Sequence, residues 1–162
     1  MNKLFLISLI FLLLPFTIFA QTAEELDILL ETKAVSVEKA ARFVLGAVGL
    51  LPEELHGEEA EYEAYQMALS NGWVKKAATD EVTLKDLSFL VMNAFNFKGG
   101  IFYSVFKNPR YAYREMLYRK LIHGRSDPSF AVSGNRLLQI LSSALSYSGE
   151  NDLTELQSGG NI

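Results

Sequence analysis

The amino-acid sequence predicts a mostly α-helical protein of about six helices, arranged as three helix-turn-helix repeats. Apolar residues recur at the three- and four-residue spacing of an amphipathic helix in several segments. Three of those segments also open alike, with a valine followed by Ser36, Thr83 or Ser133, and these hydroxyl residues are 47 and 50 residues apart. A recurring period of this length is typical of a repeat architecture.

The first repeat is expected to contain a short helix over Ala23–Leu30 and a longer helix over Ser36–Leu50. The short helix follows from the string ELDILLETK, which is apolar on one face. The longer helix begins at Ser36, because a serine oxygen can accept a hydrogen bond from a free backbone N–H group of the first turn. Apolar residues such as Phe43 and Val44 mark the face that we expect to enter the core.

The second repeat is expected to contain helices over Glu58–Ser70 and Thr83–Asn96. Acidic residues are concentrated where the short helix begins, and negative charge is favourable at the positive end of the helix dipole. Thr83 is expected to cap the longer helix. Asp86 follows three residues later, close to the pattern of a capping box.

The segment over residues 95–106 separates the second and third repeats. It contains aromatic, β-favouring runs on both sides of Gly99 and Gly100, which predicts a small hairpin or a packed loop. Its aromatic residues are expected to cover the core. The alternative is that they are exposed and contact a partner or a membrane. The residues of this predicted partner loop are Phe102, Tyr103 and Phe106.

The third repeat is expected to contain helices over Pro109–Leu121 and Ser133–Tyr147. Proline suits the first position of a helix, because the N–H group that it lacks would have no partner there. The strings AYQMALSNGWVKKAATD and AYREMLYRKLIHGRSDP precede the long helices of the second and third repeats and begin 48 residues apart. The polar, glycine-containing tail over residues 148–162 is expected to be disordered.

Residues 1–20 are predicted to be a secretory signal peptide. Lys3 supplies the positive charge, residues 4–14 the apolar run, and Pro15 precedes a cleavage site after Ala20. The alternative is an uncleaved anchor, because the apolar stretch approaches the roughly 18 residues that can span a bilayer. We therefore expect an exported bacterial protein of the periplasm or cell envelope.

Composition limits what the exported part can do. The 162-residue chain contains no cysteine, which excludes a disulfide scaffold, a thiolate metal site and a cysteine nucleophile. Residues 21–147 are long enough for a single domain with its own core. Residues 21–86 carry a net charge of −8 and residues 87–147 carry +6. Such a dipolar surface can attract an acidic partner to its basic half.

Five strings resemble the motifs of the S-layer homology (SLH) domain, a bacterial envelope-anchoring module of three repeats. They are VSVEK, VTLKD and VSGNR at the starts of the long helices, and the turns GWVKKAATD and IHGRSDPSF. The resemblance implies a threefold helical architecture and attachment to the envelope. In that family an arginine after the Ser or Thr binds anionic wall glycan. Here those positions hold Val37, Leu84 and Gly134, so we expect the architecture to carry over and the glycan chemistry not.

The best candidate for binding is the string NPRYAYREMLYRK over residues 108–120. Arginine binds carboxylate or phosphate with two hydrogen bonds, and tyrosine rings stack on sugars or cations, which suits an anionic glycan, a lipid headgroup or an acidic protein. The alternative is a solvated helix with its tyrosines half-buried against the core. The predicted binding residues are Arg110, Tyr111, Arg114, Tyr118, Arg119, Lys120 and Arg125.

No catalytic residue, metal or cofactor is expected. His56 and His123 have no second ligand at a metal-binding spacing. Residues 123–127 indicate a turn rather than a catalytic triad, and Asp127 directly before a proline is itself a turn signal. The carboxylates over residues 58–63 lie on one short helix, so they cannot flank a sugar ring as a glycosidase requires.

The expected function is therefore a non-enzymatic envelope interaction or scaffold domain that binds an anionic cell-wall polymer or an acidic envelope protein. The first alternative is a periplasmic accessory subunit of a membrane-associated machine, docking through residues 95–106. The second alternative is a small ligand-binding protein or enzyme. Peripheral membrane association is compatible with the first two, and nucleic acid is not expected as a partner of an exported protein.

Overall fold

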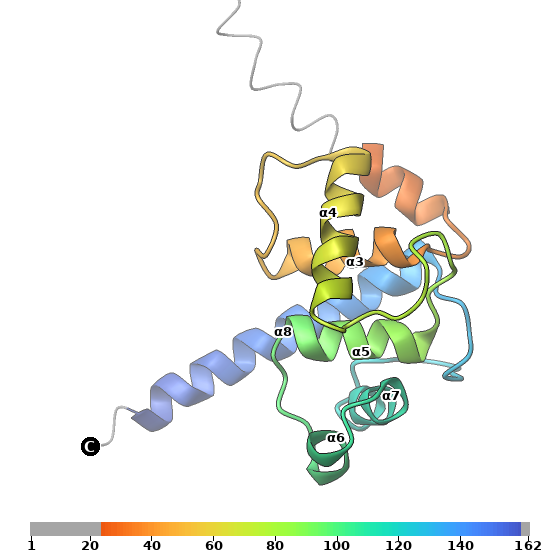
Figure 1. Ribbon diagram of the computed structural model, residues 1–162. Helices are drawn as coiled ribbons and strands as arrows, with labels where there is room; N and C mark the ends of the chain where they lie inside the picture. The colour runs from red at the N-terminus through yellow and green to blue at the C-terminus, as the bar shows by residue number, and fades with distance from the viewer. Residues whose placement is uncertain (1–23, 160–162) are drawn as a thin grey trace, which may run out of the picture.

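The computed structural model describes residues 24–159, and the side chains of residues 24–149 (Figure 1). The predicted signal peptide and residues 160–162 lie outside the described residues. The described residues contain seven helices, and the mostly α class is confirmed. None of these helices is both long and apolar enough to cross a membrane. The first helix covers residues 24–31. The others are α3 (Val37–Ala47), α4 (Gly57–Ser70), α5 (Leu84–Ala94), α6 (Ile101–Val105), α7 (Pro109–Tyr118) and α8 (Gly134–Gly159).

The three repeats meet in a closed ring of backbone hydrogen bonds between the valines that precede the three caps. The N–H group of Val35 donates to the carbonyl of Val132 (2.8 Å), Val132 to Val82 (3.1 Å), and Val82 back to Val35 (2.9 Å). All three residues are buried. Each repeat therefore donates to one neighbour and accepts from the other, which gives the three predicted repeats a threefold arrangement.

A second set of backbone bonds continues this symmetry at the first residue of each long helix. That N–H group has no partner within its own helix, and a carbonyl from the loop or turn before the next long helix accepts it. The three pairs are Val37 with Asp80, Leu84 with Phe130 and Gly134 with Thr32, each at 2.9 Å. The start of every long helix is thus fixed by a different repeat.

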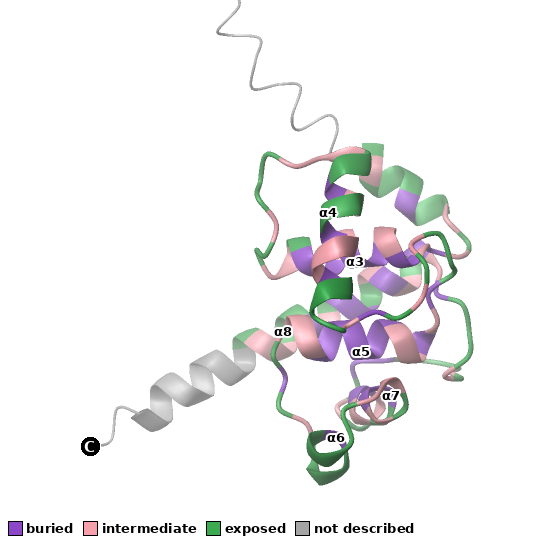
Figure 2. Ribbon diagram, viewed as in Figure 1, coloured by how far each residue is buried: buried purple, intermediate pink, exposed green. Residues whose placement is uncertain are grey.

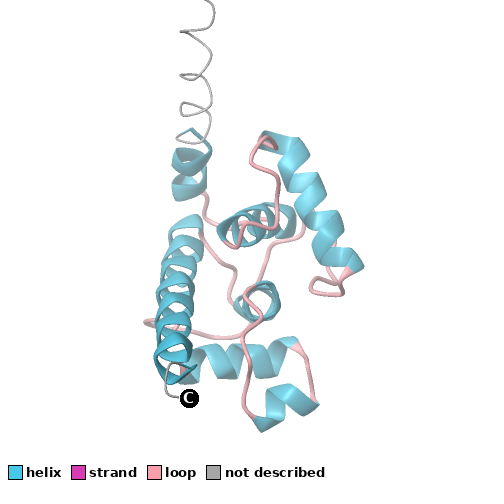
Figure 3. Cartoon of the chain, turned by 90° about the vertical axis from the view of Figure 1, so that its left-hand side faces the viewer, coloured by secondary structure: helices cyan, strands magenta, loops and turns pink. Residues whose placement is uncertain are grey.

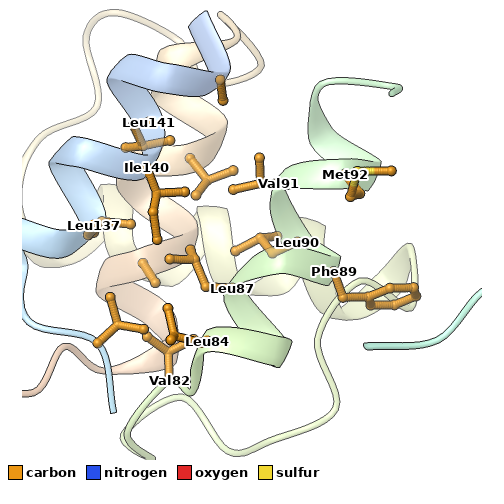
Figure 4. Packing of buried hydrophobic residues seen from close by; sticks show 14 of the residues in the cluster. Val82, Leu84, Leu87, Phe89, Leu90, Val91, Met92, Leu137, Ile140 and Leu141 are labelled. Atoms are coloured by element: carbon orange, nitrogen blue, oxygen red, sulfur yellow. The ribbon is translucent and has the colours of Figure 1, made fainter. Parts of the chain in front are cut away.

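The long helices α3, α5 and α8 surround the ring, and their inward faces form one hydrophobic core. Figure 4 shows α5 and α8 directing leucine, isoleucine and valine side chains toward each other. Four residues after each cap stands a side chain with no exposed surface, namely Ala40, Leu87 and Leu137. α3 also packs on α4, and α5 on α7, which in each case is the short helix of the following repeat. Burial accordingly follows the inner helix faces (Figure 2).

The ends of the long helices differ between repeats. Gly49 and Asn96, which follow α3 and α5, have φ angles of 67° and 51°. This left-handed conformation is typical of a helix C-terminus and favours glycine or asparagine. α8 has no such stop and continues to Gly159. The structure therefore differs from the disordered tail predicted from residue 148, since the backbone is helical through residue 159.

The prediction of a hairpin over residues 95–106 is wrong. The described residues contain no β-strand, and the paired backbone is limited to two isolated bridges, Ser36 with Glu81 and Thr83 with Ala131 (Figure 3). The segment forms the short helix α6 instead. Gly99, two residues before this helix, has no room for a side chain, because a Cβ atom there would lie 2.3 Å from a ring carbon of Tyr103, which packs over this glycine.

The three repeats joined by the valine ring form a frame, and Gly134 is expected to be its most substitution-sensitive glycine. A Cβ atom at this position would lie 1.6 Å from the carbonyl oxygen of Leu29, which itself is fully buried. We expect Gly134→Ala to lower the free energy of unfolding by about 3 kcal/mol, because backbone must move to admit one methyl group. Urea denaturation measures this change.

The matched control lies in the same helix. A Cβ atom on Gly149 has no neighbour within 4 Å, so Gly149→Ala is expected to stabilise the protein by about 0.5–1 kcal/mol through helix propensity. Equal effects of the two substitutions would contradict the close approach of α8 to residues 24–31.

Candidate functional site

The predicted binding residues lie on and after α7, which begins at a well-formed cap. The side-chain oxygen of Asn108 accepts hydrogen bonds from the N–H groups of Arg110 (3.0 Å) and Tyr111 (3.2 Å), and Pro109 occupies the first helical position. The core-facing side of the helix carries Ala112, Tyr113 and Met116, all buried. Other residues of α7 and its C-cap form two further stripes, each with its own role.

The first stripe, Tyr111, Glu115 and Arg119, holds α6 and the loop before it. One carboxylate oxygen of Glu115 accepts a hydrogen bond from the N–H group of Gly100 (3.0 Å), and the other accepts from Arg119 Nε (2.9 Å). The same guanidinium donates to the carbonyl of Lys98 and lies 5.1 Å from the ring centroid of Tyr147. We call the Glu115–Arg119 pair and these contacts the Glu115 clamp.

Two aromatic contacts complete the attachment of α6. Tyr103 points inward and is 4% exposed, and burial raises the pKa of its phenol above the ordinary tyrosine value. The rings of Phe102 and Phe106 both stack on Tyr111, with centroids 6.0 Å and 5.9 Å away. The helix is therefore anchored from below by Tyr103 and from the side by Tyr111, although it has only five residues.

This attachment leaves a set of large apolar side chains in water. The fractional exposures are 81% for Ile101, 68% for Phe102, 66% for Val105 and 55% for Phe106. The expectation that the aromatic residues of this segment cover the core is therefore correct for Tyr103 and wrong for Phe102 and Phe106. Tyr103, in turn, is not available as a residue of a partner loop.

The second stripe of α7 is cationic and exposed. Arg110, Arg114 and Tyr118 follow one another at four-residue spacing, which places them on one face of the helix. All three are exposed, Tyr118 to 84%. Lys107, which directly follows Phe106, is exposed too, and within the described residues neither it nor the two arginines form an ion pair.

The exposed apolar and cationic residues together form a surface that we call the α6–α7 platform. It comprises Ile101, Phe102, Val105, Phe106, Lys107, Arg110, Arg114 and Tyr118. Arg114 is three positions from Tyr111, on the neighbouring stripe, so the cations border the apolar residues that stack there. Sequence patterns missed Ile101, Val105 and Lys107, because only the fold shows that α6 turns these side chains outward.

Four of the predicted binding residues lie outside the platform, namely Tyr111, Arg119, Lys120 and Arg125. Tyr111 and Arg119 are part-buried and contact α6 or its loop, so they support the platform rather than face a partner. Arg125 lies in the loop between α7 and α8, where its guanidinium carbon is 5.9 Å from the ring centroid of Phe130. In the same loop Ser129 donates hydrogen bonds through its hydroxyl and N–H groups to Asp127, which lowers the pKa of that carboxyl and confirms the predicted turn.

Lys120 occupies an unusual backbone position. Its φ angle is 57°, and the equivalent residue of the second repeat is Gly72, with φ of 70°. A residue with a side chain is strained in this left-handed conformation by about 1 kcal/mol. The third repeat therefore carries an exposed cation where the geometry favours glycine.

No group of three or more potential metal ligands is found among the described residues. His123 is exposed, and His56 lies at the start of α4 beside Gly57, whose N–H group donates to Glu25 (2.8 Å). The expectation that the protein has no metal or cofactor stays a prediction.

The Glu115 clamp is expected to keep α6 folded. Glu115→Ala removes the acceptor of Gly100 and leaves Arg119, which is largely buried, without its counter-charge. We expect the free energy of unfolding to fall by about 1–2 kcal/mol and the amide protons of α6 to exchange faster. Glu63→Ala, on the exposed side of α4, is the matched control and should change stability by less than about 0.5 kcal/mol. Unchanged exchange in α6 would refute the clamp.

Lys120→Gly is expected to raise the free energy of unfolding by about 1 kcal/mol, because glycine adopts the left-handed conformation without strain. Gly72→Ala is the reciprocal test. Its added Cβ atom would have no neighbour within 4 Å, so only the backbone angle opposes it, and a loss of about 1 kcal/mol is expected. Thermal denaturation of both variants measures the two shifts, and shifts of the same sign would show that the two turns are not equivalent.

No protein-family model, curated protein or solved structure matches the chain. The resemblance to SLH domains accordingly stays a prediction from the repeat motifs.

Proposed function

We propose that this protein is an exported, non-enzymatic docking domain of the bacterial cell envelope, and that the α6–α7 platform is its docking surface. The observation that carries the proposal is the exposure of four large apolar side chains, three on the five-residue helix α6 and the fourth at its C-cap Phe106. They lie next to cations that form no ion pair among the described residues. Contiguous exposed apolar surface with a polar rim is typical of an interaction site.

The attachment of α6 supports the same proposal. Exposed apolar residues that served no purpose would cost solubility, yet here the Glu115 clamp and the Tyr111 stack hold them outward in a fixed position. A surface that is held in its binding conformation loses less conformational entropy when a partner binds. The platform therefore has the properties of a preorganised contact surface.

The charge distribution favours an anionic partner. The acidic side chains of the α4 region and the platform lie at opposite ends of the molecule, as α4 and α6 do in Figures 1 and 3. The exposed acids of that region are Glu53, Glu54, Glu58, Glu59 and Glu63. Such a dipole turns the basic end toward an anionic surface during encounter.

From the resemblance to SLH domains this proposal takes only the repeat architecture and not the glycan-binding site. The positions at which that family carries its glycan-binding arginine hold Val37, Leu84 and Gly134, which are buried and donate their N–H groups to neighbouring loops. A cation at those positions would not reach solvent without disturbing the frame. We therefore assign docking to the platform, outside the repeated motif.

The test is retention on isolated bacterial envelope fragments, measured by co-sedimentation at low and high salt. Wild-type protein is expected to be retained at low salt and released as salt rises, because salt screens the attraction between exposed charges. Arg110→Gln/Arg114→Gln and Phe102→Ser/Phe106→Ser are each expected to weaken retention about tenfold or more, equivalent to about 1.4 kcal/mol.

Two control variants remove the same chemistry from other surfaces. Lys33→Gln/Lys75→Gln removes two exposed cations, and Tyr62→Ser/Leu69→Ser removes two exposed apolar side chains of α4. Both should be retained like wild type. Retention that does not depend on salt, or platform variants that bind like the controls, would refute the docking role.

A further inference from the structure

The platform has the form of an element that inserts into a surface rather than one that receives a ligand. α6 lies at one extreme of the molecule in two perpendicular views (Figures 1 and 3). Ile101, Phe102, Val105 and the adjoining Phe106 are exposed by 55% to 81%, which means that they project from the body. A projecting apolar helix can enter a fluid medium that has no preformed pocket, whereas a rigid partner would need a matching groove.

The side chains at the tip are chemically suited to the boundary region of a lipid bilayer. Ile101 and Val105 are aliphatic, and Phe102 and Phe106 are aromatic. Acyl chains can cover all four. A polysaccharide could stack the C–H faces of its sugars on the two rings, but its hydroxyl-rich surface would cover the aliphatic pair less completely than acyl chains would. Interfacial helices commonly bury such residues about 5–10 Å deep while their basic residues stay at the headgroups.

The cations lie beside the apolar tip, at the depth where they would meet the headgroup phosphates. Lys107 directly follows the apolar residues of α6, and Arg110 and Arg114 line the neighbouring face of α7. Exposed Tyr118 continues the arginine stripe. Tyrosine is enriched at membrane interfaces, and each arginine or lysine close to an anionic leaflet strengthens attachment. The apolar tip thus matches the acyl-chain layer of an anionic membrane, and the basic rim matches its headgroup layer.

From this arrangement we infer that the partner of the α6–α7 platform is an anionic phospholipid bilayer, into whose surface α6 inserts peripherally. The inference rests on the proposed docking function and names its partner. The acidic α4 region then points away from the anionic leaflet, which sets the orientation of the bound molecule. Insertion is shallow, because α6 has five residues and the charged stripe of α7 remains at the headgroups.

The experiment is flotation of the full protein with vesicles made of equal parts phosphatidylglycerol and phosphatidylcholine, compared with vesicles of phosphatidylcholine alone. Wild-type protein is expected to float with the anionic vesicles, to release at high salt, and to bind the neutral vesicles about tenfold or more weakly. Ile101→Ser/Val105→Ser isolates the aliphatic contribution and should weaken binding about tenfold. Phe102→Ser/Phe106→Ser and Arg110→Gln/Arg114→Gln should each weaken binding to the anionic vesicles to a similar degree.

Tyr62→Ser/Leu69→Ser and Lys33→Gln/Lys75→Gln serve as controls and should float like wild type, and circular dichroism checks that each variant is folded. Folded wild-type protein that does not float with anionic vesicles would overturn the membrane assignment, as would flotation that the platform variants do not weaken.

Envelope retention separates the two proposals. If platform-dependent retention persists without vesicle binding, and protease treatment of the fragments abolishes it, the partner is a protein; the docking role then stands and the bilayer is excluded. If retention does not depend on the platform either, both proposals fail.

Discussion

Three backbone hydrogen bonds between buried valines determine how the rest of this molecule is arranged. Val35, Val82 and Val132 each donate to one neighbour and accept from the other, so the ring has no free position. A buried N–H or C=O group without a partner costs about 1–3 kcal/mol, and removing any repeat would leave such groups behind. The three long helices therefore begin at fixed points around the ring, and the short helices α4 and α7 pack on α3 and α5.

The functional features lie where the third repeat departs from this symmetry. The extra segment that forms α6 enters between α5 and α7, at the outside of the frame, so it does not disturb the ring. Its attachment uses side chains on a single stripe of α7, and the frame supplies the buried site of Tyr103 and the Tyr147 ring beside Arg119. Lys120 shows the same pattern, since it departs from the glycine of the second repeat at an exposed turn. A rigid repeated core can thus carry a variable surface.

Sequence patterns predicted the frame well and the site only in part. Ser36, Thr83 and Ser133 do precede the long helices, as the repeat period indicates. The two serine oxygens accept hydrogen bonds from N–H groups of the first turn. The predicted cap at Thr83 is wrong, because its hydroxyl donates to the Asp86 carboxylate and caps no N–H group. The valine ring was not predictable, since it depends on which repeats meet in space. Exposure of Phe102 and Phe106 was only the alternative interpretation of the sequence, because aromatic residues cover cores more often than they project. The internal role of Arg119 had a visible signal in Glu115 four residues earlier, a spacing that forms ion pairs on helices.

Closure of the ring also has a kinetic consequence. The first and third repeats contact each other directly, as in the hydrogen bond from the Asn135 side chain to the carbonyl of Leu30, 105 residues away. Open solenoids contact only the next repeat and can grow or fray from their ends. Here the last bonds form only after nearly the whole domain has been synthesised, and such long-range closure slows folding. The domain is therefore expected to fold as one cooperative unit, late in its synthesis.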